Sequence, residues 1–282
     1  MEARPARPRA SARRWVLLGA VLLGAAGRPG ADDDDSAAVE TCAVRASGGV
    51  GGAPGMSWHT VPGWSTDDGS DLPDYEVVVY RPAALDGPAP LAVFTSNPVP
   101  GEREAIEGFL TDIGSGFDAW ADEHGYLVAF PVAGGVEGGE LGFRTGQDEP
   151  YMGAAIEAVA GAFDVDRNRV HLFGRSGGGR LAIQLAQAHA DTVASILSLA
   201  GPQPFPNWES GEPTWSRPVG GLFVHDEADP IVGRPTVLDT VAMFQAQGAP
   251  VETFFDYSGG HDWLAAEIEP RMADFFARTC RE

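Results

Sequence analysis

The pattern with the most chemical content is Gly-Arg-Ser-Gly-Gly at residues 174–178, centred on Ser176. The apolar residues 170–173 before it indicate a buried strand, and a helical pattern follows from Leu181. A G-x-S-x-G sequence between a strand and a helix is typical of a sharp turn that presents a nucleophilic serine. The N–H of Gly177, at the start of the helix, would face a developing oxyanion. We interpret Ser176 as a nucleophile; the alternative is a tight glycine turn with a solvated serine.

A serine hydroxyl becomes a good nucleophile when a histidine takes its proton and an acid orients that histidine. His261 stands in Ser-Gly-Gly-His-Asp-Trp, a loop after the last strand-like segment and downstream of the serine. We therefore predict that His261 is the base. The acid is expected in His-Asp-Glu-Ala-Asp-Pro at residues 225–230, directly after the preceding strand. We choose Asp229, in the turn that the proline closes, with Asp226 as the second candidate.

Strand-like and helix-like segments alternate along the rest of the chain, which predicts an α/β fold with a mostly parallel central sheet and helices on both faces. We expect one catalytic domain over residues 57–282. Strands are predicted at residues 75–80, 91–94, 127–130, 170–173, 193–200, 222–225 and 251–257. Helices are predicted at residues 117–124, 152–163, 181–189, 237–247 and 265–278.

Two long loops, residues 132–148 and 202–218, follow the carboxyl ends of predicted strands, where open α/β sheets bind their ligands. Trp208 and Trp215 lie in the second loop, and Trp263 follows the predicted base by two residues. We expect these three tryptophans to contact the substrate. The alternative is that they pack on the body of the domain.

Residues 164–179, 225–232 and 259–263 together resemble one group of α/β-hydrolases, the secreted polyhydroxybutyrate depolymerases, feruloyl esterases and acetylxylan esterases. The resemblance covers about residues 75–280. It implies the α/β-hydrolase fold and the hydrolysis of a small-molecule or polymeric carboxylic ester through an acyl-enzyme, with no metal or other cofactor. The rival interpretations are a serine peptidase of the same fold and a hydrolase-like binding protein that has lost its oxyanion loop.

The oxyanion loop is where the sequence departs from this group. The group has His-Gly after the strand that corresponds to residues 91–94, and the next N–H completes the oxyanion hole. Here the matching residues are Thr-Ser-Asn-Pro, and Pro98 has no N–H to donate. We expect Asn97 or Ser96 to supply a second donor beside the Gly177 N–H, because loss of one donor costs about 10²–10³ in rate.

The first 26 residues predict a secretory signal. Five of the first 14 residues are arginines, and the next 12 are uncharged and too few to span a bilayer. We expect export to the periplasm or the medium, by the general or the twin-arginine route; the alternative is a retained anchor. Residues 27–56, with aspartates at 32–35 and many glycines, predict a flexible linker, and the aspartate run lacks the spacing of a calcium loop.

Cys42 and Cys280 are the only cysteines, and such a pair in an exported protein predicts a disulfide rather than two free thiols. No Cys/His cluster indicates a zinc site. The formal net charge is −21, and every basic residue is arginine. Because this charge repels phosphate backbones and anionic lipid, we expect neither nucleic-acid binding nor membrane binding after signal cleavage. We expect a monomer.

Overall fold

The computed structural model describes residues 42–63, 74–95, 107–108, 110–111, 116–132, 149–201 and 215–281. The chain divides into Met1–Ala38 and a compact unit, Val39–Glu282, which contains all of the described residues. The predicted signal, the aspartate run and the segments at 96–98 and 202–214 lie outside the described residues.

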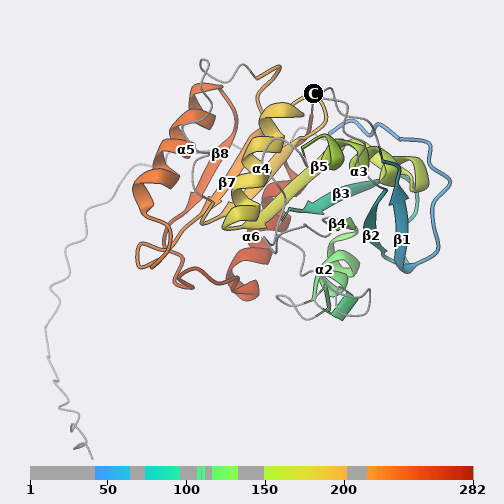
Figure 1. Ribbon diagram of the computed structural model, residues 1–282, viewed down its shortest axis with the longest axis horizontal. Coiled ribbons are helices and arrows are strands. Elements are labelled where there is room, and N and C mark those ends of the chain that lie inside the picture. Colours follow the sequence, from blue (N-terminus) through green and yellow to red (C-terminus); the bar gives the residue numbers. More distant parts are fainter. Residues whose placement is uncertain are drawn as a thin grey trace, which may run out of the picture. The chain divides into compact units, whose positions relative to one another are not determined.

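Eight strands form one sheet in the order β1-β2-β4-β3-β5-β6-β7-β8 (Figure 1). β1 and β2 pair antiparallel, as do β2 and β4, and every later pair is parallel. The prediction of a mostly parallel sheet is therefore confirmed. The strands are β1 Gly55–Val61, β2 Tyr75–Arg81, β3 Ala89–Phe94, β4 Leu127–Val132, β5 Val165–Arg175, β6 Ser195–Leu199, β7 Gly220–Val224 and β8 Val251–Phe254.

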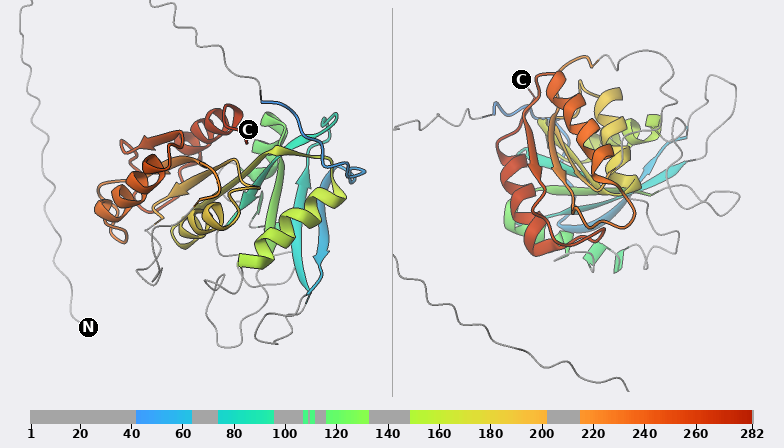
Figure 2. Two further views of the ribbon diagram at one scale, coloured as in Figure 1. Left: turned by 90° about the horizontal axis from the view of Figure 1, so that it is seen from above. Right: turned by 90° about the vertical axis from the view of Figure 1, so that its left-hand side faces the viewer.

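Helices cover both faces of this sheet, as Figure 2 shows: α2 and α6 lie on one face and α3, α4 and α5 on the other. Every residue of β3, β6 and β7 is buried, because strands covered on both faces form the core of the domain. The helices are α2 Phe117–His124, α3 Glu149–Ala162, α4 Gly177–Ala188, α5 Arg234–Ala246 and α6 Ala265–Ala277. Among the described residues, no helix has the length and apolar character needed to cross a membrane.

The Cys42–Cys280 disulfide joins the N-terminal arm to the end of the chain, with 5.9 Å between the two Cα atoms. The predicted pairing is thus confirmed. The bond joins residue 42 to the segment directly after α6. The two cysteines are 238 positions apart in sequence, so the bond closes almost the whole domain into one loop.

The described part of the predicted linker, residues 42–56, is fixed to the domain, so the flexible-linker prediction is wrong for these residues. The Ser47 N–H donates to the Val165 carbonyl at 2.8 Å, and a β-bridge joins Ala46 to Asp166. A Cβ on Gly49 would collide with the backbone of Phe163. Gly49 is therefore required by close packing, although a glycine in such a sequence would ordinarily indicate a flexible segment.

Candidate active site

Ser176 occupies a sharp turn between β5 and α4, as the G-x-S-x-G pattern predicts. Its backbone has φ 55° and ψ −121°, a conformation that non-glycine residues adopt at a cost of about 1–3 kcal/mol. The turn is held on both sides, because the Ser176 N–H donates to the Leu199 carbonyl at 2.8 Å and its carbonyl accepts from the Arg180 N–H at 3.0 Å. Such strain persists only where the surroundings impose it, which is typical of a functional position.

Close packing around the turn explains the glycine at position 174. A Cβ there would lie 2.6 Å from both the Gly178 carbonyl carbon and the Thr95 hydroxyl oxygen. Thr95 Oγ1 lies 2.8 Å from the Gly178 carbonyl oxygen and 3.0 Å from the Phe173 carbonyl oxygen. Thr95 therefore joins the end of β3 to the turn. Sequence reasoning missed this role, although Thr95 is the first polar residue after a fully apolar strand.

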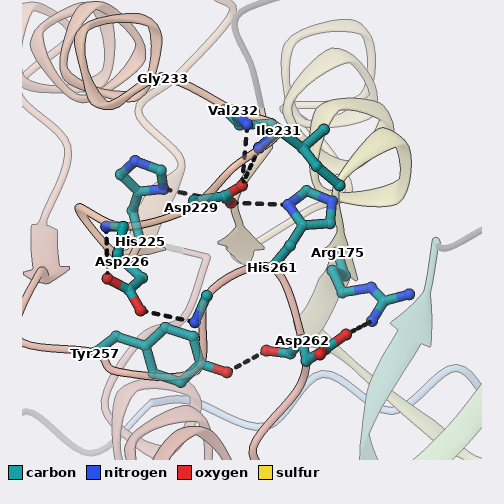
Figure 3. Close-up of polar contacts among 12 residues, drawn as sticks. Arg175, His225, Asp226, Asp229, Ile231, Val232, Gly233, Tyr257, His261 and Asp262 are labelled. Carbon is teal, nitrogen blue, oxygen red and sulfur yellow. Dashed lines mark hydrogen bonds and ion pairs between the residues drawn. The ribbon is translucent and has the colours of Figure 1, made fainter. Parts of the chain in front are cut away.

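Asp229 and His261 form the central polar contact of the site (Figure 3). Asp229 Oδ2 lies 2.8 Å from His261 Nδ1, and the Asp229 side chain is fully buried whereas that of His261 is 14% exposed. Asp229 Oδ1 accepts the N–H groups of Ile231 at 2.8 Å and Val232 at 3.0 Å. The Asp229 carboxylate thus has a donor on each oxygen.

These donors keep Asp229 ionised. Burial of the carboxyl group favours its neutral form, but the hydrogen bonds from His261, Val232 and Ile231 outweigh burial and hold the pKa of Asp229 below its ordinary value. Because an ionised carboxylate has no proton to donate, the hydrogen in the contact belongs to His261 Nδ1. The other ring nitrogen, Nε2, is then the one that can accept a proton.

Asp226, the second candidate acid, acts on the backbone of the histidine loop instead. Its Oδ2 accepts the Gly260 N–H at 2.7 Å, and its Oδ1 accepts the Ala228 N–H at 2.8 Å. These two backbone hydrogen bonds hold the pKa of Asp226 below its ordinary value. Its hydrogen bonds go to the residue before His261 and not to the imidazole, so the geometry favours the first choice of acid, Asp229.

Further contacts fix the loop that carries His261. The Tyr257 hydroxyl donates to the Asp262 carbonyl and accepts the Leu264 N–H at 3.0 Å. Arg175 Nη1 lies 3.2 Å from Asp262 Oδ1. The residue before Ser176 therefore contacts the residue after His261, which brings the two loops together at the carboxyl edge of the sheet (Figure 3). Sequence reasoning did not identify Tyr257, Arg175 or Asp262.

A second serine–histidine pair, Ser195 and His171, lies inside the domain. Ser195 Oγ is 2.8 Å from His171 Nδ1, and both residues are fully buried. Burial, together with the nearby charge of Arg169, lowers the pKa of His171 to about 3, so its imidazole is a poor base for a serine hydroxyl. His171 also stacks on Phe276 with 4.5 Å between ring centroids. These features assign the pair to the core.

His225 directly follows β7 and is also fully buried. Its Nδ1 lies 3.9 Å from Asp229 Oδ2, too far for a hydrogen bond, and burial is the main cause that lowers the pKa of His225. Asp229 therefore faces a neutral imidazole on one side and the hydrogen-bonded ring of His261 on the other.

The predicted substrate contacts are only partly within the described residues. Trp263 packs edge-on against Phe117, 5.9 Å between centroids, and its Nε1–H donates to Glu269 Oε1 at 3.2 Å. Trp215 packs against Phe244 with 4.7 Å between centroids.

Trp208, Ser96 and Asn97 lie outside the described residues, so substrate contact and oxyanion donation by these residues stay predictions. Within the described ranges, no group of three or more His, Cys, Asp or Glu side chains could hold a metal ion.

Solved structures with similar architecture include two esterases. A thermostable esterase matches with a TM-score of 0.60 and 15% identity, over 80% of this chain and 63% of that one. The hyperthermophilic esterase of Pyrobaculum calidifontis matches with a TM-score of 0.56 and 16% identity, over 80% and 86%. This chain has the α/β-hydrolase fold. Dipeptidyl peptidase 4 of Porphyromonas gingivalis also matches, with a TM-score of 0.57 and 15% identity over 81% of this chain and 36% of that one.

One curated relative adds a likeness in sequence. The protein named "Putative esterase NocK" from Nocardia uniformis subsp. tsuyamanensis is 31% identical over 188 residues, which is 60% of this chain and 53% of the relative. The α/β-hydrolase chain thus spans about half the length of that relative. No family model matches this chain. Esterases and a dipeptidyl peptidase share this fold, so the fold alone does not determine the activity.

Proposed function

We propose that the chain is a serine hydrolase that cleaves carboxylic esters through an acyl-enzyme. The observation that carries the proposal is the strained turn of Ser176 beside the loop in which His261 contacts Asp229 at 2.8 Å. A nucleophile, a base with an available ring nitrogen and a buried ionised acid are the three groups that acyl transfer requires. The esterase name of the curated relative supports the same reaction class.

In the proposed reaction, Ser176 Oγ attacks the ester carbonyl carbon while its proton passes to His261 Nε2. The bond to the alcohol oxygen then breaks, and the alcohol leaves with that proton. Water then attacks the acyl carbon while its proton passes to His261 Nε2, and the bond to Ser176 Oγ breaks as His261 returns that proton to the serine, which releases the carboxylic acid. Asp229 orients the imidazole and stabilises its charged form in both halves.

The oxyanion is proposed to bind at the amino end of α4. The first N–H groups of a helix have no acceptor within the helix, and Gly177 is the first residue of α4. The helix dipole adds positive potential at the same place. We propose Asn97, or the Ser96 side chain, as the second donor.

The proposed substrates are small or polymeric carboxylic esters, and polyesters and plant cell-wall esters fit the group that the motifs resemble. Export to the periplasm or the medium is part of the proposal. The arginine-rich start, the uncharged segment that follows it and the Cys42–Cys280 disulfide support this, because disulfides persist in oxidising compartments.

Hydrolysis of p-nitrophenyl acetate tests the proposal. We expect turnover by the wild-type chain, near-complete loss in Ser176→Ala and His261→Ala, and retained turnover in Ser195→Ala, which removes the buried serine as a matched control. Circular dichroism melts confirm that each variant folds. Loss in Ser195→Ala with activity in Ser176→Ala would overturn the assignment. Cleavage of a dipeptidyl p-nitroanilide but not of the ester would favour a peptidase, and no turnover of either would favour a binding protein.

A further inference from the structure

A cavity of about 340 Å³ lies where the N-terminal arm meets the amino end of β5. Three of its lining residues are Arg45, Arg167 and Arg281, and an acidic side chain, Asp191, also borders it. β5 has 11 residues, so its amino end lies roughly 30 Å from the turn of Ser176 at its carboxyl end. We propose that this cavity is a binding site for a small oxyanion, a phosphate, sulfate or carboxylate group, held by the guanidinium groups of Arg45 and Arg281.

The backbone positions of the two arginines are fixed by the fold. The Arg281 N–H donates to the Asn168 carbonyl at 2.8 Å. The Arg45 N–H donates to Asp166 Oδ1 at 2.9 Å, and the Arg45 carbonyl accepts the Arg167 N–H at 2.8 Å. The disulfide joins their segments, because Cys42 lies three residues before Arg45 and Cys280 directly precedes Arg281. Two residues from opposite ends of the chain thus reach one cavity on anchored backbone.

The charge of these two side chains is unbalanced. Arg167 is already paired, with both of its terminal nitrogens on the Glu157 carboxylate at 2.7 and 2.9 Å. Every other arginine side chain in the described part of the chain has a hydrogen-bond, ion-pair or aromatic partner; those of Arg45 and Arg281 have none there. Arg45 is exposed and Arg281 is half-buried, so both guanidinium groups keep donors free for an anion at the cavity.

Electrostatics at Arg281 support an anion there. Burial lowers the pKa of Arg281, the charges of Arg45 and Arg167 lower it further, and Asp191 opposes this only in part. An oxyanion between the two guanidinium groups would relieve the repulsion, and the planar fork of arginine matches oxyanions with two parallel hydrogen bonds.

The ligand is expected to be small. A cavity of this volume is near the lower end of the range for small-molecule sites, and the net charge of the chain repels an extended polyanion. Apolar side chains, including Ile156 and Val170, form part of the wall. An organic carboxylate or phosphate ester therefore fits as well as an inorganic anion.

Isothermal titration calorimetry of the full chain with sodium phosphate, sodium sulfate and sodium acetate, at matched ionic strength in a chloride buffer, tests the proposal. We expect saturable 1:1 binding of at least one probe. Arg45→Gln combined with Arg281→Gln should weaken that binding at least tenfold. The matched control, Arg271→Gln combined with Arg278→Gln, removes the same charge from partnered arginines and should change the affinity less than twofold.

Binding of phosphate or sulfate identifies a tetrahedral anion, and binding of acetate identifies a carboxylate; either result supports the site. Absence of saturable binding to the wild-type chain, or equal weakening in the control, would overturn it. The double variant should retain its hydrolysis of p-nitrophenyl acetate, because none of the substituted residues belongs to the proposed active site. Calorimetry does not depend on that activity, so the two proposals fail separately.

Discussion

Asp226 and Asp229 lie three residues apart in one loop, and the structure predicts different consequences for the same substitution at each. Asp229 accepts hydrogen bonds on both oxygens, from His261 Nδ1 on Oδ2 and from two backbone N–H groups on Oδ1. Asparagine has one acceptor oxygen. In either orientation, Asp229→Asn places its NH₂ group against a donor, and the charge that stabilises the imidazolium is lost.

The expected loss in kcat for Asp229→Asn is about 10⁴-fold, the size that follows when the acid no longer imposes the productive tautomer of the base. At 1.36 kcal/mol for each factor of ten, this equals about 5 kcal/mol of transition-state stabilisation. Asp226→Asn keeps one acceptor for the Gly260 or the Ala228 N–H and leaves the imidazole contact in place. We expect a loss of about tenfold or less there, because only the anchoring of the loop is weakened.

The assay is steady-state hydrolysis of p-nitrophenyl acetate by the two variants, with thermal melts as the control for folding. The loss in Asp229→Asn should appear in kcat rather than KM, since the interaction strengthens as the imidazolium forms. If Asp226→Asn loses as much activity as Asp229→Asn while both remain folded, the assignment of the acid is wrong.

The disulfide, the glycine at position 174 and the Asp226 carboxylate can each be tested separately. Replacing Cys42 and Cys280 by serine should lower the free energy of unfolding by up to about 5 kcal/mol, measured by urea denaturation, because the loop of 238 residues is no longer closed; an unchanged midpoint would contradict this. Gly174→Ala should destabilise the fold by about 1–3 kcal/mol and reduce turnover, because its Cβ would meet Thr95 and the α4 backbone at 2.6 Å; a wild-type melt with full activity would be evidence against this packing. Because the folded-state pKa of Asp226 is lowered, its stabilising contribution is present above its unfolded value near 3.9 and is lost as the pH falls below that value. The melting temperatures of wild type and Asp226→Asn should therefore converge between about pH 5 and pH 2; a constant difference would contradict the shift.

Local sequence patterns predicted much of the fold and the turn of Ser176. The apolar runs that became β3, β4 and β7 could be identified because strands buried on both faces admit few polar residues. The helix predicted at residues 117–124 has the bounds of α2, and Gly125 follows it with a φ of 72°, a conformation that suits glycine. The turn at Ser176 combined a motif with a strand before it and a helix after it, so that one local pattern specified both geometry and chemistry.

What the sequence did not predict depends on contacts between distant segments. β1 was missed because this half-buried edge strand contains several polar residues and follows a glycine-rich segment. Residues 42–56 have the composition of a linker, yet residues 45–47 among them pair with β5 more than 100 positions away. The bonds from Tyr257 and Arg175 to Asp262 likewise depend on how the strands align, which no local pattern reveals.

The central claim is that Ser176 is the nucleophile, and covalent trapping tests it most directly. Incubation with a fluorophosphonate should add one phosphonyl group, and peptide mapping by mass spectrometry should locate it on Ser176. The adduct should be absent in Ser176→Ala and should form far more slowly in His261→Ala. Absence of any adduct on the folded wild-type chain, or an adduct on another serine such as Ser195, would contradict the account.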